Sequence, residues 1–292
     1  MILNRREFLN LGLVSSLAVF SARTFAGNCV KAESTVFVGG VIGFDALERA
    51  ATSAPFRDTC RGGLYIHAYI WAKLSDSQRE KILLNFSGLP TEIEIGIPRN
   101  AESWFKQVFK KQYLDIGVNA RHAHVNGFNQ QSFLVWADFV RVARDYKLEI
   151  VAPVFSPNGG QYKQEPFKSS RWDFLREGAK IGGGLTTDSP PTFFLGQPEA
   201  YRNFVVDEIK WANGEGLRST FIISPNKAGP NFMADTQRAV DYLDKRGALP
   251  AAWVVENYDA VVPTSYINRI GDTSNKNTVL GVANWLARQV GM

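Results

Sequence analysis

The chain has 292 residues, of which 45% are hydrophobic and 21% are charged, and its formal net charge is +5 at pH 7. This length is sufficient for a large domain with its own buried core, and no run of lysines or arginines stands out. The mild positive charge does not favour a nucleic-acid-binding protein, so we expect no nucleic-acid partner.

The first 26 residues have the features of an export signal. Arg5 and Arg6 precede a Phe-Leu pair and a mildly apolar stretch, and Ala26 is a small residue suited to a cleavage point. The stretch is too short and too rich in Gly, Ser and Asn to span a membrane as a helix. The sequence "NRREFLN" resembles the twin-arginine export signal, which implies a bacterial protein that is periplasmic or secreted. We expect residues 27–292 to remain after cleavage, without stable membrane insertion.

The two cysteines, Cys29 and Cys60, follow this leader. After export they could form one disulfide, or they could stay as buried free thiols, and the sequence leaves both possibilities open. Neither cysteine has the histidine-rich surroundings of a catalytic thiol.

Beyond residue 33, short apolar runs alternate with amphipathic stretches. The runs are mostly rich in Val, Ile, Phe or Tyr, which is typical of buried strands. They cover residues 34–40, 63–71, 92–98, 115–121, 148–155, 181–187, 219–224 and 251–257. Apolar residues at helical spacing predict helices over residues 76–86, 101–111, 130–146, 199–213, 234–247 and 279–290.

This alternation predicts one architecture above others. Strands that alternate with helices form parallel sheets, and eight such units close into a (β/α)8 barrel. We therefore expect a single TIM barrel over residues 27–292. An open doubly wound sheet is the alternative, but no GxGxxG or GxxxxGK[ST] sequence follows a strand, so we expect no nucleotide cofactor.

Polar and aromatic residues lie near the ends of the predicted strands. In a barrel, the carboxyl ends of the strands and the loops after them form the active face. Three runs end in proline followed by asparagine, which suits the end of strand pairing and the start of a turn. The candidate substrate-binding residues on this face are His67, Tyr69, Trp71, Arg99, Arg121, His122, His124, Asn126, Asn158, Asn226, Tyr258 and Asp259.

Three acids are the candidate catalytic residues, with Glu256 and Asp188 as the main pair and Glu94 in reserve. Glu256 ends an apolar run, where a carboxylate is not expected unless a site uses it, and Asp188 lies between a strand and a double proline. Glu94 lies inside the third run and is a third acid if it points into the barrel. Each also has a structural explanation: an ion pair for Glu256, a turn cap for Asp188 and a packing role for Glu94.

Two carboxylates that face each other across a sugar can split a glycosidic bond, one as proton donor and one as nucleophile or base. Together with the export signal, the barrel and the aromatic residues, the acids make the chain similar to TIM-barrel glycoside hydrolases. That resemblance implies an exported enzyme that cleaves a bacterial polysaccharide and needs no metal. The largest group of these enzymes has an Asn-Glu pair after the fourth strand and a glutamate after the seventh, and both are missing here. No catalytic residue is therefore transferred.

Four alternatives use the same predicted face. A polysaccharide lyase would use His122 or Tyr69 as its base and Arg121 to neutralise a uronate. A zinc hydrolase would gather His67, His122, His124 and Asp188. A metal-free phosphodiesterase would use two histidines with Arg99 or Arg121. A non-catalytic polysaccharide-binding protein would need the aromatic residues without the acids.

Overall fold

We describe the protein from a computed structural model. It describes residues 36–40, 62–85, 90–118, 120–128, 133–155, 173–225, 231–257 and 277–289. The leader, both cysteines and four of the candidate substrate-binding residues lie outside this part of the chain: Asn158, Asn226, Tyr258 and Asp259. The predictions that concern those residues stay predictions.

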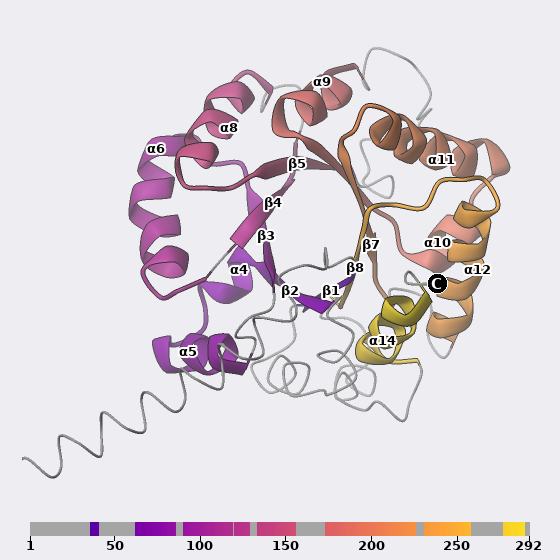
Figure 1. The fold of residues 1–292 in the computed structure, drawn as a ribbon, viewed down its shortest axis with the longest axis horizontal. Helices are drawn as coiled ribbons and strands as arrows, with labels where there is room; N and C mark the ends of the chain where they lie inside the picture. Colours follow the sequence, from indigo (N-terminus) through magenta and orange to yellow (C-terminus); the bar gives the residue numbers. More distant parts are fainter. Residues whose placement is uncertain are drawn as a thin grey trace, which may run out of the picture.

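The described residues form a closed barrel of eight parallel strands with helices around it (Figure 1). The strands are β1 (Val36–Gly40), β2 (Gly62–His67), β3 (Thr91–Gly96), β4 (Ala120–Asn126), β5 (Ile150–Phe155), β6 (Gly184–Asp188), β7 (Arg218–Ile223) and β8 (Ala252–Asn257). They are arranged in chain order, and β8 pairs with β1 to close the barrel. The prediction of a (β/α)8 barrel is confirmed.

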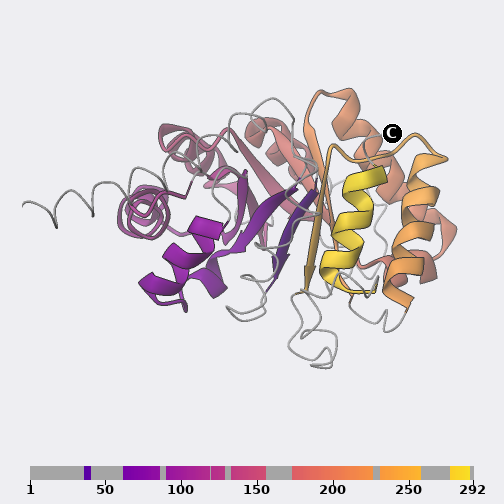
Figure 2. The ribbon, with the colours of Figure 1, turned by 60° about the horizontal axis from the view of Figure 1, so that its bottom comes forward.

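The helices of the outer layer follow the strands. They are α4 (Ala68–Trp71), α5 (Asp76–Asn85), α6 (Ala101–Trp104), the π-helical η1 (Phe105–Leu114), α8 (Trp136–Asp145), α9 (Asp173–Gly182), α10 (Pro191–Gly196), α11 (Glu199–Gly214), α12 (Phe232–Asp244) and α14 (Val279–Gln289). The helix α14 packs against β1 and β8, the two strands that close the barrel (Figure 2). In the described part of the chain, no helix is long and apolar enough to cross a membrane.

Three of these helices, α4, α9 and α10, were not predicted from the sequence. Glycine lowers helix propensity, and α9 contains Gly178 in its middle and Gly182 at its end. The fold explains Gly178, because a Cβ atom there would lie 2.6 Å from the ring of Phe128. The glycine that weakens the helical pattern is therefore required for close packing of α9.

Two predicted strands differ from the observed ones in a way that affects the candidate site. The second run ends as a strand at His67, and the four residues that follow it form α4. The fourth strand covers residues 120–126 rather than 115–121, because residues 115–117 form the turn that ends η1, with Gly117 at a φ of +87°. Side chains predicted to follow β4 therefore lie within it.

The strand β4 also contains a bulge beside β3. Thr91 pairs with Ala120, but the next residue, Glu92, pairs with His122, so Arg121 is an extra residue on β4. His122 consequently faces the barrel interior, with His124 and Asn126 following at every second position. Arg121 is exposed near the amino-terminal end of the strand.

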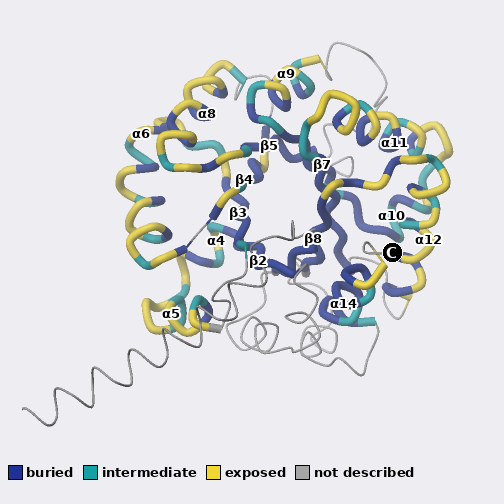
Figure 3. Tube along the Cα trace, in the orientation of Figure 1, coloured by how far each residue is buried: buried dark blue, intermediate teal, exposed yellow. Residues whose placement is uncertain are grey.

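Burial separates the strands from the outer surface of the helices (Figure 3). A large apolar cluster lies between the strands and the helices. A small apolar cluster lies inside the barrel and consists of Phe37, Tyr65, Ile222, Ala252 and Val254. The other inward-facing positions include many polar side chains, which form the candidate site.

Candidate active site

Polar side chains from neighbouring strands gather inside the barrel in two groups. We call Tyr65, His67, Glu94, Asn126 and Glu256 the upper cluster, because it lies toward the carboxyl ends of the strands. We call Glu92, His122, His124, Thr186 and Arg218 the lower cluster. The upper cluster therefore occupies the end of the barrel where substrates bind in characterised barrel enzymes.

A single imidazole joins two carboxylates in the upper cluster. His67 Nε2 lies 2.5 Å from Oε2 of Glu256, and His67 Nδ1 lies 3.4 Å from Oε1 of Glu94. All three side chains are buried. The predicted acids Glu94 and Glu256 thus meet at one histidine, although they come from opposite parts of the sequence.

Glu94 also has two neutral hydrogen-bond donors. The Tyr65 hydroxyl donates to Oε2 at 2.6 Å, and the Asn126 amide donates to Oε1 at 3.0 Å. Glu94 is therefore held at both oxygens, and its possible role as a packing residue does not account for this polar arrangement.

Burial and charge have opposite effects on the pKa of His67. Burial alone would lower it, but the carboxylates of Glu256 and Glu94 outweigh burial and raise the pKa of His67 to about 9. Burial raises the pKa of Glu256, and the neighbouring His67 only partly offsets this. His67 therefore retains its proton at a pH where an exposed histidine would have lost it.

Asp188, which was predicted to form the main acid pair with Glu256, is the last residue of β6 and is partly exposed. Its negative charge contributes to the raised pKa of His67. Asp188 thus belongs to the same end of the barrel, but Glu94 is the acid that shares the imidazole with Glu256.

The lower cluster is built around Glu92. Its Oε1 accepts a hydrogen bond from Arg218 Nη2 at 2.6 Å and lies 2.5 Å from His122 Nδ1. Its Oε2 lies 2.7 Å from His124 Nε2, and His124 Nδ1 lies 2.7 Å from the Thr186 hydroxyl. Burial alone would raise the pKa of Glu92, but Arg218 and the two histidines hold that pKa well below its usual range.

The prediction that His122 and His124 lie on the carboxyl-terminal face is wrong. Both lie deeper in the barrel, because β4 begins five residues later than predicted. The zinc site that combined them with His67 is also not formed, since both histidines bind Glu92 instead. The prediction that Arg121 lies on the carboxyl-terminal face is wrong for a related reason, because the bulge on β4 turns its side chain outward.

Of the two aromatic residues predicted to bind substrate after β2, Trp71 differs from the prediction and Tyr69 does not. Trp71, the last residue of α4, is buried against η1, where its Nε1 donates to the Gln112 carbonyl and its ring stacks on Tyr113. It is a core residue and not a substrate-binding residue. Tyr69 is 68% exposed on α4, and its hydroxyl accepts a hydrogen bond from Lys73.

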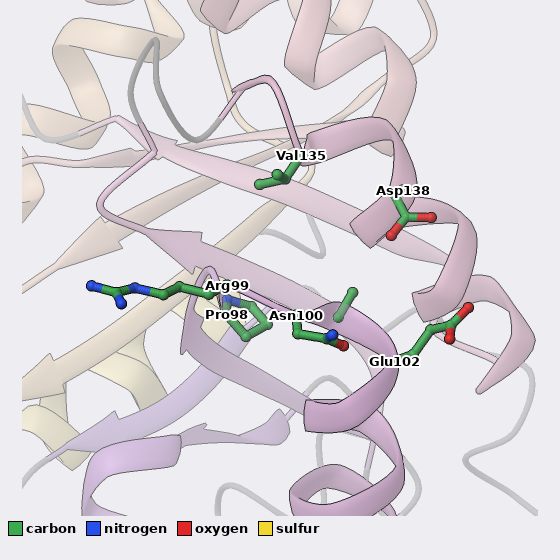
Figure 4. A pocket seen from close by; sticks show the side chains of 7 residues that line it. Pro98, Arg99, Asn100, Glu102, Val135 and Asp138 are labelled. Atoms are coloured by element: carbon green, nitrogen blue, oxygen red, sulfur yellow. The ribbon is translucent and has the colours of Figure 1, made fainter.

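Arg99 lies in the segment that follows β3 and is exposed. It lines a pocket of about 230 Å³ together with Pro98, Asn100, Val135 and Asp138 among others (Figure 4). The side chain of Asn100 caps α6 by accepting a hydrogen bond from the Ser103 amide at 2.8 Å. Arg99 is therefore accessible at the end of β3, as predicted for a rim residue.

Sequence reasoning did not identify Tyr65, Thr186 and Arg218 as members of the site. The sequence does contain a signal for a polar barrel interior, because polar residues recur at every second position of two strands. On β3, Glu92 and Glu94 alternate with isoleucines. On β4, the polar residues at every second position are His122, His124 and Asn126. Such alternation inside a barrel strand indicates a polar interior rather than a polar rim.

The upper cluster is also the group in the described part of the chain that could hold a metal ion. One atom each from His67, Glu94 and Glu256 lies within 4.8 Å of the others, and imidazole and carboxylate are common ligands of divalent metals.

No known protein family and no curated protein matches the chain. Solved structures that resemble it include a truncated 3-deoxy-D-arabino-heptulosonate 7-phosphate synthase from Thermotoga maritima, at 11% identity and a TM-score of 0.48, covering 89% of this chain and 86% of that one. The glycoside hydrolase domain of PgaB from Bordetella bronchiseptica has 11% identity and a TM-score of 0.44, and the match covers 86% of this chain and 99% of the PgaB domain. Dihydropteroate synthase from Thermus thermophilus has 14% identity and a TM-score of 0.41, and the match covers 82% of this chain and 93% of the synthase. These enzymes have different activities, and likenesses this distant do not indicate which activity the chain has.

Proposed function

We propose that the chain is an enzyme that hydrolyses glycosidic bonds of a bacterial polysaccharide, with the upper cluster as its active site. The observation that carries the proposal is the pair of buried carboxylates, Glu94 and Glu256, which one imidazole holds at the carboxyl-terminal end of the barrel. Glu256 also has a raised pKa, and a perturbed acid at this end of a barrel is typical of a catalytic site.

The surroundings of the two carboxylates favour different roles. Burial raises the pKa of Glu256, which suits a general acid that protonates the leaving oxygen. Glu94 accepts hydrogen bonds from Tyr65 and Asn126, one at each oxygen, and this fixed position suits a nucleophile or base. His67 contacts both groups and would orient Glu256, which would recover its proton from the water that releases the sugar from Glu94.

The close approach of one oxygen from each acid is compatible with cleavage with retention of configuration. One oxygen of Glu94 and one oxygen of Glu256 lie within 4.8 Å. Retaining glycosidases have carboxyl groups about 5–5.5 Å apart, whereas inverting enzymes need about 6.5–9.5 Å to admit a water. Glu94 would therefore attack the sugar directly, while Asp188 at the rim would bind a hydroxyl group or the incoming water.

Substrate binding would extend from this pair over the rim. Asn126 and Arg99 are exposed near the ends of β4 and β3, and Tyr69 is exposed on α4. The proposed contacts also include Asn158, Asn226, Tyr258 and Asp259, which follow β5, β7 and β8 in the sequence. Amide, guanidinium and aromatic groups of this kind bind sugar hydroxyls and the apolar faces of sugar rings.

The proposal is tested by incubating residues 27–292 with a panel of bacterial polysaccharides and analysing the products. With a cleaved substrate, Glu256→Gln should lower kcat by about 10²–10⁴-fold, the usual contribution of a general acid, and leave substrate binding intact. Glu208→Gln is the matched control, because Glu208 is equally buried but lies on α11. It should leave kcat of the folded protein unchanged.

Other outcomes would contradict the proposal. A polysaccharide that binds without being cleaved would indicate a binding protein. An unsaturated product that absorbs ultraviolet light would indicate a lyase.

A metal-dependent hydrolase is the second candidate, because the three ligand atoms of the upper cluster lie within 4.8 Å of one another. A chelator separates the two candidates. Loss of activity on chelation, and its recovery with a divalent ion, would favour the metal enzyme, whereas unchanged activity supports acid–base catalysis by Glu256 and Glu94.

A further inference from the structure

The lower cluster occupies a part of the barrel that aliphatic side chains normally fill. Barrel interiors are packed mainly with layers of Val, Ile and Leu. Here Glu92 is 1% exposed and His124 is 2% exposed, and Arg218 reaches the same carboxylate from the far side of the barrel. A charged group is thus buried where an apolar one would be usual.

Stability does not explain why the buried ion pair of Glu92 and Arg218 is present in the barrel interior. Replacing a buried ion pair with apolar residues of similar volume is often neutral or stabilising, because burial removes the charges from water. The fold could therefore be built without Glu92 and Arg218. What the lower cluster provides is a fixed geometry, since Glu92 has a partner at both oxygens and His124 has a partner at both ring nitrogens.

Tyr65 connects this fixed geometry to the upper cluster. Its ring packs edge-on against His124, with ring centroids 5.1 Å apart, and against His67, with centroids 5.3 Å apart. Its hydroxyl donates to Glu94. A displacement of His124 would therefore move the Tyr65 ring, and with it the donor that holds Glu94 beside His67.

The backbone provides a second connection. Glu92 and Glu94 lie on the same face of β3, and their partners His122, His124 and Asn126 lie on the same face of β4. The bulge at Arg121 allows this register, and the contacts of Glu92 with both histidines hold it in place.

We infer that Glu92 is a positioning residue, which acts through His124 and Tyr65 to hold Glu94 and His67 in their arrangement at the mouth of the barrel. The inference rests on the proposed function in one respect, because it assumes that the upper cluster is the active site. Glu92 itself lies below that cluster and touches no substrate.

The test uses Glu92→Gln, which keeps the size of the side chain but removes its charge, and Glu208→Gln as the matched control. Glu208 is also fully buried and is also held by an arginine, Arg176, but this pair lies between α9 and α11 in the outer layer. A general effect of losing a buried ion pair would appear in both variants. An effect of positioning would appear only in Glu92→Gln.

The first readout is the proton of the short contact between His67 Nε2 and Glu256, measured by NMR. The chain has three histidines, so each ring signal is assigned by substituting one histidine at a time. In Glu92→Gln we expect this proton to exchange with water at least about tenfold faster than in the unchanged protein, because the site opens more often. Glu208→Gln should leave the rate unchanged, and equal rates in all three proteins would overturn the inference.

Thr186→Val is a second variant in case Glu92→Gln does not fold. It removes the hydroxyl bound to His124 Nδ1 and keeps the shape of the side chain, so we expect a smaller acceleration in the same direction. An unchanged His67 signal in a folded Thr186→Val protein would also count against the inference.

The second readout is kinetic and requires a substrate. Glu92→Gln should lower kcat and leave KM nearly unchanged, because no substrate contact is lost. An unchanged kcat would overturn the inference. If no polysaccharide is cleaved by the unchanged protein, the proposed function fails, while the NMR comparison still decides whether Glu92 positions the upper cluster.

Discussion

His67 lies between two buried carboxylates, and this position links its protonation to folding. Its pKa is raised from 6.5 to about 9 in the folded chain, where burial would lower it but Glu256 and Glu94 raise it more. A raised pKa stabilises the fold fully below the unfolded value of 6.5, and this stabilisation is lost as the pH rises through about 9.

We therefore predict that the free energy of unfolding falls between pH 6.5 and 9, by about 3 kcal/mol at most. Denaturant unfolding across this range measures the change. In His67→Gln, the part of the pH dependence of the unfolding free energy that comes from His67 should disappear. A wild-type protein whose stability does not depend on pH in this range would contradict the prediction.

The same residue gives a spectroscopic prediction. NMR titration should place the pKa of His67 near 9. Glu256→Gln should lower this pKa substantially, because burial lowers it and the Glu256 carboxylate that opposes burial is removed. Arg141→Gln, on the exposed face of α8, is a control that should not change the titration. A pKa of His67 that stays the same in Glu256→Gln would show that the 2.5 Å contact with Glu256 is absent in solution.

At the scale of the element, β1 determines how Tyr65 of β2 can be placed. A Cβ atom at Gly39 would lie 2.7 Å from the Tyr65 carbonyl oxygen and 2.8 Å from its Cβ. Backbone atoms cannot move aside as a flexible side chain can, so the two strands would have to separate. Glycine at this position is thus required for the close approach of β1 to β2.

We predict that Gly39→Ala destabilises the protein by about 1–3 kcal/mol, the usual cost of overpacking, and lowers activity because Tyr65 shifts away from Glu94. Thermal unfolding and the His67 NMR signal measure the two effects. The control is Gly96→Ala on β3, where no atom lies within 4 Å of the added Cβ. Equal stability of the two variants would contradict the prediction.

At the scale of the whole molecule, export remains a prediction from residues 1–26. Replacing Arg5 and Arg6 with lysine should retain the protein inside the producing cell, because the twin-arginine pair is the part of the signal that is recognised. Cell fractionation measures this, and a deletion of residues 1–26 is the control for complete retention. Unchanged export of the lysine variant would indicate a different route.

The sequence by itself determined the architecture and indicated four members of the upper cluster, namely His67, Glu94, Asn126 and Glu256. Alternation of strands and helices is a local pattern, and eight repeats of it leave a closed barrel as the favoured arrangement. Glu94 and Glu256 could be predicted as inward-facing acids because a carboxylate within an apolar run must have a partner inside the fold.

Only the tertiary structure decided the depth of each polar residue and its partner. A shift in strand boundaries moved His122 and His124 into the lower cluster, and the bulge on β4 turned Arg121 outward. His67 meets Glu256 across 189 residues, and Arg218 meets Glu92 across 126 residues. These contacts depend on closure of the barrel, which brings distant strands together, and no pattern within one strand specifies them.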